Sequence, residues 1–325
     1  MKESKKYCGI DISSETIDVC YRDKDDKVTH LKIENTQKGF VKLLKSCSED
    51  THFVMESTGV YHMNLVFYLH QKNAQFSVVN ALKIKRYIQM HLEQNKTDRK
   101  DAQRIMEYGE ANHPEAYKMP EEAYFECRSL NQTIHDLTKQ ITKISNQLHA
   151  LKKNPFNNKS VDKSLRSIIK KLRNEKKKLN EELQLKLREW EPELLKQVRS
   201  VKGIGDRAAS ELIVYTKGFR GMENYRQLIS YAGLSPVERS SGSSIRHRVR
   251  ISKQGGKHLR NILYMCALNA KETNRACREL YDRLVAKGKN KKSAIIAVCN
   301  KLLKQVFGCI KNGTLYDDNY GKRFV

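Results

Sequence analysis

Apolar residues in the first 120 positions of the 325-residue chain fall into short runs that alternate with amphipathic stretches. Helical spacing of the apolar positions predicts helices around 40–44, at 64–71 and from about 82 onward. Runs rich in β-branched and aromatic residues predict strands at 7–12, 16–21, 28–33, 53–56 and 76–79. Polar turns separate the first three strands, so we expect a meander followed by alternating helices and strands.

A heptad pattern replaces this alternation beyond residue 120. Its first seam consists of Leu130, Ile134, Leu137, Ile141, Ile144, Leu148 and Leu151. Pro155 and neighbouring asparagines predict a break, and a second seam follows at Leu165, Ile169, Leu172, Leu179, Leu183, Trp190 and Leu194, interrupted by Lys176. The seams could pair within one chain as a helical hairpin or between chains. In both cases residues 121–195 are interpreted as a coiled-coil assembly element, which predicts a homodimer or homotetramer.

The last third begins with an apolar helix end, then Gly203-Ile204-Gly205, then a new helix. This order is typical of a helix-hairpin-helix, whose glycines let backbone N–H groups approach a phosphate, although it also occurs as an ordinary tight corner. Lys202, Gly203 and Gly205 are therefore candidate nucleic-acid contacts. Apolar faces predict further helices at 259–270, 280–286 and 293–310.

The order of these elements predicts a mixed α+β chain in three parts. Three strands followed by alternating helices and strands are the order of a ribonuclease-H-like domain, expected over residues 1–120. The helical coiled-coil middle follows over 121–195, and a mainly helical domain over 196–325.

The charge is strongly basic and unevenly distributed. Lysine and arginine number 62 against 37 acidic residues, a net charge of +25, and most of the excess lies beyond residue 200. Residues 239–271 contain no acidic residue, and their basic residues are Arg239, Arg246, Arg248, Arg250, Lys253, Lys257, Arg260 and Lys271. Because this charge runs through a turn-rich segment and not along one helix face, it predicts a nucleic acid as the partner and not a membrane surface.

Other features limit the cellular setting. The longest purely apolar runs, such as 294–299, are only a few residues long, and the N-terminus has no signal-peptide pattern. We therefore expect a cytoplasmic protein without a membrane partner. The eight cysteines are scattered without a zinc-binding spacing, so we expect reduced thiols.

Four carboxylates in the first domain are candidates for metal-ion chemistry. Asp11 lies within an apolar strand, Glu56 ends another, and Asp98 and Asp101 are three residues apart on one helix face. In a ribonuclease-H fold these elements converge at one edge. Clustered carboxylates repel unless they are protonated or bind a cation, and oxygen ligands favour Mg²⁺ or Mn²⁺. The alternatives are that Asp98 is a helix N-cap, that Asp101 pairs with Arg104 or Lys100, and that Glu56 caps a turn.

A serine-rich loop precedes the basic run. Ser240, Ser241, Ser243 and Ser244 surround Gly242, and arginines flank them. Composition alone is typical of a flexible phosphate-binding loop and does not identify a nucleophile.

Several of these segments, taken together and in order, carry a family resemblance. They are Gly9-Ile10-Asp11-Ile12-Ser13, Glu56-Ser57-Thr58-Gly59-Val60-Tyr61, residues 96–102, Gly233-Leu234-Ser235-Pro236, Ser241-Gly242-Ser243-Ser244 and residues 252–260. The chain resembles the DEDD transposases of the insertion-sequence-one-ten group, relatives of the pilin-gene invertases. One departure is Gly255-Gly256, where relatives often have a Gly-Asn-like pair.

The resemblance implies a RuvC-like N-terminal domain, a coiled coil and a C-terminal transposase domain with a catalytic serine. By motif matching, Asp11, Glu56, Asp98 and Asp101 take the metal-binding positions and Ser241 takes the nucleophile. It also implies RNA-guided recombination in bacteria, in which a structured bridge RNA pairs with target and donor DNA. The remaining interpretations are a metal-dependent nuclease resembling a Holliday-junction resolvase, in which the serine loop only binds DNA, and a non-catalytic RNA-binding assembly protein.

Overall fold

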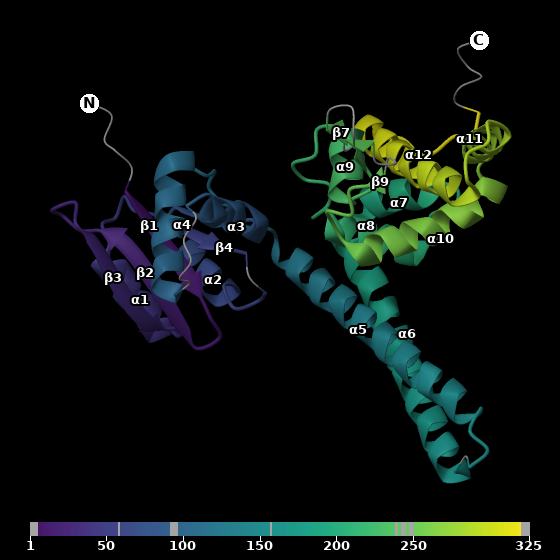
Figure 1. The fold of residues 1–325 in the computed structure, drawn as a ribbon, viewed down its shortest axis with the longest axis horizontal. Helices are drawn as coiled ribbons and strands as arrows, with labels where there is room; N and C mark the ends of the chain where they lie inside the picture. Colours follow the sequence, from purple (N-terminus) through teal and green to yellow (C-terminus); the bar gives the residue numbers. More distant parts are fainter. Residues whose placement is uncertain are drawn as a thin grey trace. The chain divides into compact units, whose positions relative to one another are not determined.

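The computed structural model describes residues 6–57, 59–91, 97–156, 158–237, 240–241, 245–246 and 250–319, with the backbone alone for 240–241 and 245–246. The chain forms two compact units, residues 1–119 and 120–325 (Figure 1). Unit 1 is a mixed α/β fold and unit 2 is mainly helical. The predicted α+β class is therefore confirmed at this level.

Unit 1 is built on a five-stranded mixed sheet. Its strands are β1 (Tyr7–Ile12), β2 (Thr16–Arg22), β3 (Val28–Glu34), β4 (His52–Glu56) and β5 (Phe76–Val79), in the spatial order β3-β2-β1-β4-β5. The first three form the predicted antiparallel meander, and β4 and β5 continue the sheet in parallel with β1. Every residue of central β1 except Asp11 is buried, as expected for a strand covered on both faces.

Helices cover both faces of this sheet. On one face α1 (Gln37–Ser46) and α2 (Met63–Gln71) pack against Ile10 and its neighbours. On the other face lie α3 (Ala81–Met90) and α4 (Asp98–Asn112). Helix α4 approaches β1 very closely, because a Cβ atom on Gly9 would overlap the carbonyl oxygen of Ala102 and the backbone of Met106. Glycine at this position lets helix backbone lie directly on strand backbone.

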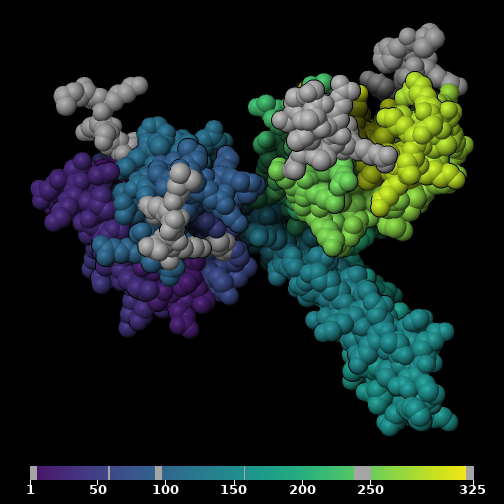
Figure 2. All heavy atoms as spheres, in the orientation of Figure 1, coloured from purple at the N-terminus to yellow at the C-terminus, as the bar shows by residue number. Residues whose placement is uncertain are grey.

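Unit 2 begins with a helical hairpin of α5 (Glu122–Leu151) and α6 (Lys159–Trp190). The two heptad seams thus pair within one chain, and the tip of the hairpin projects from the unit (Figures 1 and 2). The predicted second seam differs at its end: Leu194 belongs to the next helix, α7 (Pro192–Ser200). Pro192 stands in the first turn of α7 and disfavours helical geometry at Glu191, so α6 stops there.

Among the described residues, the body of unit 2 is completed by α8 (Asp206–Tyr215), α9 (Tyr225–Tyr231), α10 (Lys257–Thr273), α11 (Arg275–Ala286) and α12 (Lys291–Asn312). By length and composition α12 could cross a membrane. In the structure its apolar side chains, including Val298, Leu302 and Val306, are buried against α7, α9, α10 and α11. Helix α12 is thus the core helix of this unit.

Two short ribbons lie between α9 and α10. The strands β6 (Pro236–Val237) and β9 (Arg250–Ile251) pair antiparallel, and so do β7 (Ser240–Ser241) and β8 (Ile245–Arg246). All eight cysteines of the chain are free thiols, as predicted, and all except Cys47 are buried.

Candidate active site and nucleic-acid interface

Asp11 and Glu56 lie on adjacent parallel strands. The register pairs Gly9 with Val54 and Ile10 with Met55, and the next residue on each strand is Asp11 and Glu56. Alternation along a strand places Asp11 on the same face as Gly9, the face that α4 covers. Both carboxylates are half-buried and have polar partners. The structure thus brings these two predicted site residues side by side.

The first turn of α4 lies over the same end of β1. Gly109 of α4 packs on Tyr7, and residues 102–106 pack on Gly9, so α4 runs antiparallel to β1. From Gly9 to Asp11 the strand advances by two residues, or about 6.6 Å. A helix covers that distance in about four residues. The helix start, with Asp98 and Asp101, therefore lies towards Asp11.

Thr97, and not Asp98, caps α4. The Thr97 hydroxyl accepts a hydrogen bond from the backbone N–H of Lys100 at 3.3 Å. The interpretation of Asp98 as the N-cap is therefore wrong. Asp98 occupies the first helical position and is exposed, whereas Asp101 is half-buried.

An additional carboxylate, Asp18, belongs to this row. Asp18 on β2 stands directly opposite Asp11 and directly opposite Lys32 on β3. Lys32 Nζ lies 3.4 Å from Asp18 Oδ2. Asp18 was not a sequence-based candidate. Its polar position in the alternating pattern of residues 16–22 was visible, but only the strand pairing shows that it neighbours Asp11.

The carboxylates of the described residues do not form a preassembled metal site. Among the residues that the structure describes, which include all four candidates, no three His, Cys, Asp or Glu side chains are close enough to hold one ion. The donor set is nevertheless of oxygen alone, from β1, β4 and α4, and this chemistry fits a hard divalent cation such as Mg²⁺ or Mn²⁺.

Ser241 belongs to the short hairpin of unit 2. Its backbone pairs with Ile245, and Ser240 pairs with Arg246, the next predicted site residue. The neighbouring strands along the chain, β6 and β9, form a second ribbon, in which Val237 pairs with Arg250. Arg239 and Arg248 lie outside the described residues.

The base of this ribbon explains why its flanking motifs are glycine-rich. Gly233 has a φ of +70°, and a Cβ on Gly255 would overlap the Tyr231 carbonyl oxygen. Arg260 donates from Nη1 to the carbonyl oxygens of Ala232 at 3.3 Å and Gly255 at 2.9 Å. Arg260, predicted as a nucleic-acid contact, thus also holds the two ends of the ribbon together.

The remaining predicted contacts around the ribbon are open to solvent. Arg250, Lys253 and Lys257 are exposed, and Lys253 is in the left-handed region with a φ of +57°. Lys257 is the first residue of α10. An exposed cation next to a serine-bearing hairpin is suited to a phosphate contact.

The predicted helix-hairpin-helix corner connects α7 to α8. Gly203 has a φ of +103°, and a Cβ there would overlap Ala270 of α10. Gly205 is the N-cap of α8. Asp206 in the first turn of α8 pairs with Arg199 at 2.6 Å, which places a carboxylate at the positive end of this helix.

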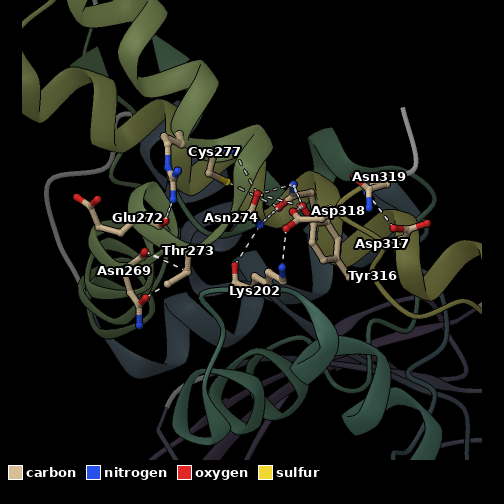
Figure 3. A network of polar contacts seen from close by, with 12 residues as sticks. Lys202, Asn269, Glu272, Thr273, Asn274, Cys277, Tyr316, Asp317, Asp318 and Asn319 are labelled. Carbon is tan, nitrogen blue, oxygen red and sulfur yellow. Dashed lines mark hydrogen bonds and ion pairs between the residues drawn. The ribbon is translucent and has the colours of Figure 1, made fainter. Parts of the chain in front are cut away.

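Lys202 takes part in a polar network with residues after α12 (Figure 3). Its Nζ lies 2.6 Å from Asp318 Oδ2, and its carbonyl oxygen accepts a hydrogen bond from Asn274 Nδ2 at 3.1 Å. Tyr316 Oη donates to Asp318 at 2.8 Å. The segment after α12 therefore binds back onto the corner.

Comparisons with known proteins cover both units. A transposase family model of the DEDD IS110 type matches residues 8–156, and a model described as Transposase IS116/IS110/IS902 family matches residues 195–282. The pilin gene-inverting proteins of Moraxella lacunata and Moraxella bovis are each 27% identical, over 97% of this chain and 98% of their own lengths. An uncharacterised 43.6 kDa protein of the insertion element IS110 from Streptomyces coelicolor is 30% identical over 118 residues, 36% of this chain and 29% of that protein.

These matches agree with the resemblance found in the sequence motifs. They extend over the carboxylate-bearing unit and over the unit with the serine hairpin. The chain therefore belongs to the IS110 family of DEDD transposases, enzymes that cut and rejoin DNA.

Proposed function

We propose that the chain is an RNA-guided DNA recombinase that uses both a serine nucleophile and metal-bound carboxylates. The observation that carries the proposal is the neighbouring placement of Asp11 and Glu56 on β1 and β4, with the start of α4 towards them. The strand order β3-β2-β1-β4-β5 supports interpreting unit 1 as a ribonuclease-H-like, RuvC-like domain.

Asp11, Glu56, Asp98 and Asp101 would hold Mg²⁺ or Mn²⁺. When bound, such an ion stabilises negative charge on a phosphate and lowers the pKa of a coordinated hydroxyl or water. Half-burial of Asp11 and Glu56 on a rigid strand pair would keep their oxygens in place. The carboxylates thus supply fixed ligands and DNA supplies the phosphate.

Ser241 would attack a DNA phosphorus through its Oγ. A bond forms between Oγ and phosphorus, and the bond between phosphorus and the 3′ oxygen breaks. The serine hydroxyl loses one proton and the leaving 3′ oxygen takes up one, which gives a free 3′ hydroxyl. A 3′ hydroxyl of another strand then attacks the phosphoserine and releases Ser241. Arg246 on β8, the strand paired with that of Ser241, and Arg250 on β9, the strand paired with β6, would hold DNA backbone phosphates.

The proposal also includes a structured RNA that guides the protein to its DNA sites, and assembly of the chain as a dimer or tetramer. The charge of +25 provides capacity for more than one nucleic-acid strand. Two pilin gene-inverting relatives match along nearly their whole lengths, which supports site-directed recombination as the reaction. The carboxylates and the serine belong to different units, so a second copy could supply one of the two. The proposed place of action is the bacterial nucleoid in the cytoplasm.

The decisive experiment is a denaturing gel of the full chain with labelled DNA, with Mg²⁺ and with a chelator. A slow-migrating covalent adduct is expected, and Ser241→Ala should abolish it while nucleic-acid binding persists. Ser240→Ala, its neighbour on the same strand, is the matched control and should retain the adduct. Absence of an adduct from the unmodified protein during active strand cleavage would favour the metal-dependent nuclease.

The guide is tested separately by sequencing RNA that co-purifies with the protein. A discrete structured RNA is expected. Recovery of only random cellular RNA from a protein that is active on DNA would contradict RNA guidance without affecting the serine mechanism.

A further inference from the structure

A cavity of about 890 Å³ lies in unit 2 where the helical hairpin joins the body. Residues of α5, α6, α8 and α10 line it, and α5, α6 and α10 all pack against α8. We call it the junction cavity. One of its walls is a polar stripe on α6, made of Arg173, Lys176, Asn180 and Gln184. Their spacing of three to four residues puts them on one helix face.

Lys176 is the residue that interrupts the second heptad seam. A leucine at this position would add about 1.5–3 kcal/mol of apolar burial to the hairpin. The chain has a half-buried lysine there instead, and this lysine lines the junction cavity. The interruption of the seam therefore coincides with a cationic wall.

The positive charge in the cavity is only partly compensated. Of its acidic lining residues, Glu181 is 3.9 Å from Lys177, and Asp206 is 2.6 Å from Arg199. Within the described ranges, Arg173 and Lys176 have no ion pair with any acidic residue. These two cations remain available to an external anion.

Arg207 of α8 contributes a fixed cation to the opposite wall. Its Nη2 lies 3.0 Å from the buried carboxylate of Glu211, and its Nη1 donates to Asn131. Because both partners hold the guanidinium, little side-chain entropy remains to be lost when an anion binds.

A stacked histidine pair lies beside Arg207. The rings of His135 on α5 and His258 on α10 have centroids 3.7 Å apart and are inclined by 31°. Burial lowers the pKa of both imidazoles, and neighbouring positive charges lower it further. Two neutral rings can stack without repulsion. His258 Nε2 is buried without a hydrogen-bond partner in the described structure and lies 3.7 Å from Glu211 Oε2, so this wall has a polar atom whose hydrogen bond is not made.

We propose that the junction cavity binds the phosphodiester backbone of a nucleic-acid strand through Arg173, Lys176 and Arg207. Its volume lies in the upper part of the roughly 300–1,000 Å³ range of ligand pockets, which suits a length of backbone better than a single phosphate. The hairpin then contacts nucleic acid as well as serving assembly. The inference depends on the family assignment and not on the serine or the guide RNA, so failure of those proposals leaves it testable.

The test compares two double variants on the same helix. Arg173→Ala/Lys176→Ala removes two cavity cations. Lys163→Ala/Lys171→Ala removes two exposed lysines that do not line the junction cavity. Binding of labelled single-stranded DNA and of RNA with the same sequence is measured by fluorescence anisotropy over a range of salt concentrations. Circular dichroism checks that both variants are folded.

The cavity variant should bind at least one of the strands about tenfold more weakly. The slope of log affinity against log salt concentration should be shallower by about 1.4, because each phosphate contact to a single strand contributes about 0.7 to that slope. The control variant should keep the original slope, and Arg173→Lys/Lys176→Arg should restore it. If only RNA binding or only DNA binding is weakened, that result identifies which nucleic acid the cavity binds. Equal losses in the cavity and control variants would overturn the proposal.

Discussion

Lys202 and Asp318, which are 116 residues apart, form an ion pair of 2.6 Å between the α7–α8 corner and the segment after α12. Lys202 is about half exposed, and Asp318 is mostly covered. Burial would raise the pKa of Asp318, but hydrogen bonds from Lys202 and Tyr316 lower it overall. The carboxylate is therefore charged at neutral pH. It pairs with Lys202, which the sequence predicts to contact nucleic acid.

Asp318→Asn should release Lys202 for nucleic acid. We expect tighter binding of nucleic acid and a dependence of affinity on salt that is steeper by about one phosphate contact. The free energy of unfolding should fall by no more than about 1 kcal/mol, because the ion pair is partly exposed. The measurement is anisotropy of labelled DNA against salt concentration, with Asp317→Asn as the neighbouring control. An unchanged affinity and slope would place Lys202 outside the interface.

Asn274 should be a large single contributor to the stability of unit 2. Its buried side chain donates to the Lys202 carbonyl oxygen at 3.1 Å and to Gln305 Oε1 at 3.0 Å, and it caps α11 by accepting from the Cys277 N–H at 3.2 Å. Asn274→Ala removes the cap and leaves buried polar groups unpaired, which should cost about 2–4 kcal/mol.

Urea unfolding followed by circular dichroism measures this cost. Asn269→Ala on α10 is the control, because Asn269 interacts with Thr273 of its own helix through its side chain (Figure 3). Its cost should stay below about 1 kcal/mol. Similar losses in the two variants would show that the network around Asn274 adds little.

Asp11→Asn should abolish strand exchange in Mg²⁺ while the fold remains intact. Asp11 stands opposite Asp18 and beside Glu56, and like charges directly opposite each other destabilise a sheet by up to about 1 kcal/mol. Removing this repulsion should leave the thermal unfolding temperature without metal unchanged or slightly higher than that of the unmodified protein. Asp25→Asn, in the β2–β3 turn, is the control for activity. Retained strand exchange in Asp11→Asn would refute the assignment of the carboxylates.

The stacked histidines should make the stability of unit 2 depend on pH. Both pKa values are lowered in the folded state, so the unfolded chain binds more protons just below pH ~6.5. Stability should be complete above that pH and should fall as the pH drops towards the lowered folded values. The slope is at most about 1.4 kcal/mol per pH unit for each histidine.

His258→Gln should make the stability of unit 2 depend less on pH. The measurement is urea unfolding at several pH values between roughly 5 and 8. The charged groups around His258 are Lys139 beside His135 on α5, Lys176 on α6 and Arg207 with Glu211 on α8. His91→Gln, in the other unit, is the control. An equally steep dependence in His258→Gln would exclude the stack as its cause.

Local patterns determined the elements of this protein. Strands β1 to β5 follow β-branched runs, and the break between α5 and α6 follows Pro155 and its asparagines, because such preferences act within a few residues. The family motifs also identified Asp11 and Glu56 as candidates. Their adjacency follows from β1–β4 pairing, which the expected fold implied and the register defines.

The tertiary structure alone decided which distant residues became neighbours. Two seams could close within a chain or between chains, and the packing of α5 against α6 is what makes them a hairpin. Asp18 joined the carboxylate row through strand register, and Lys202 gained Asp318 from a segment 116 residues away. Contacts of this kind depend on the packing of whole helices and strands, because no local preference of Lys202 or Asp18 distinguishes one remote partner from another.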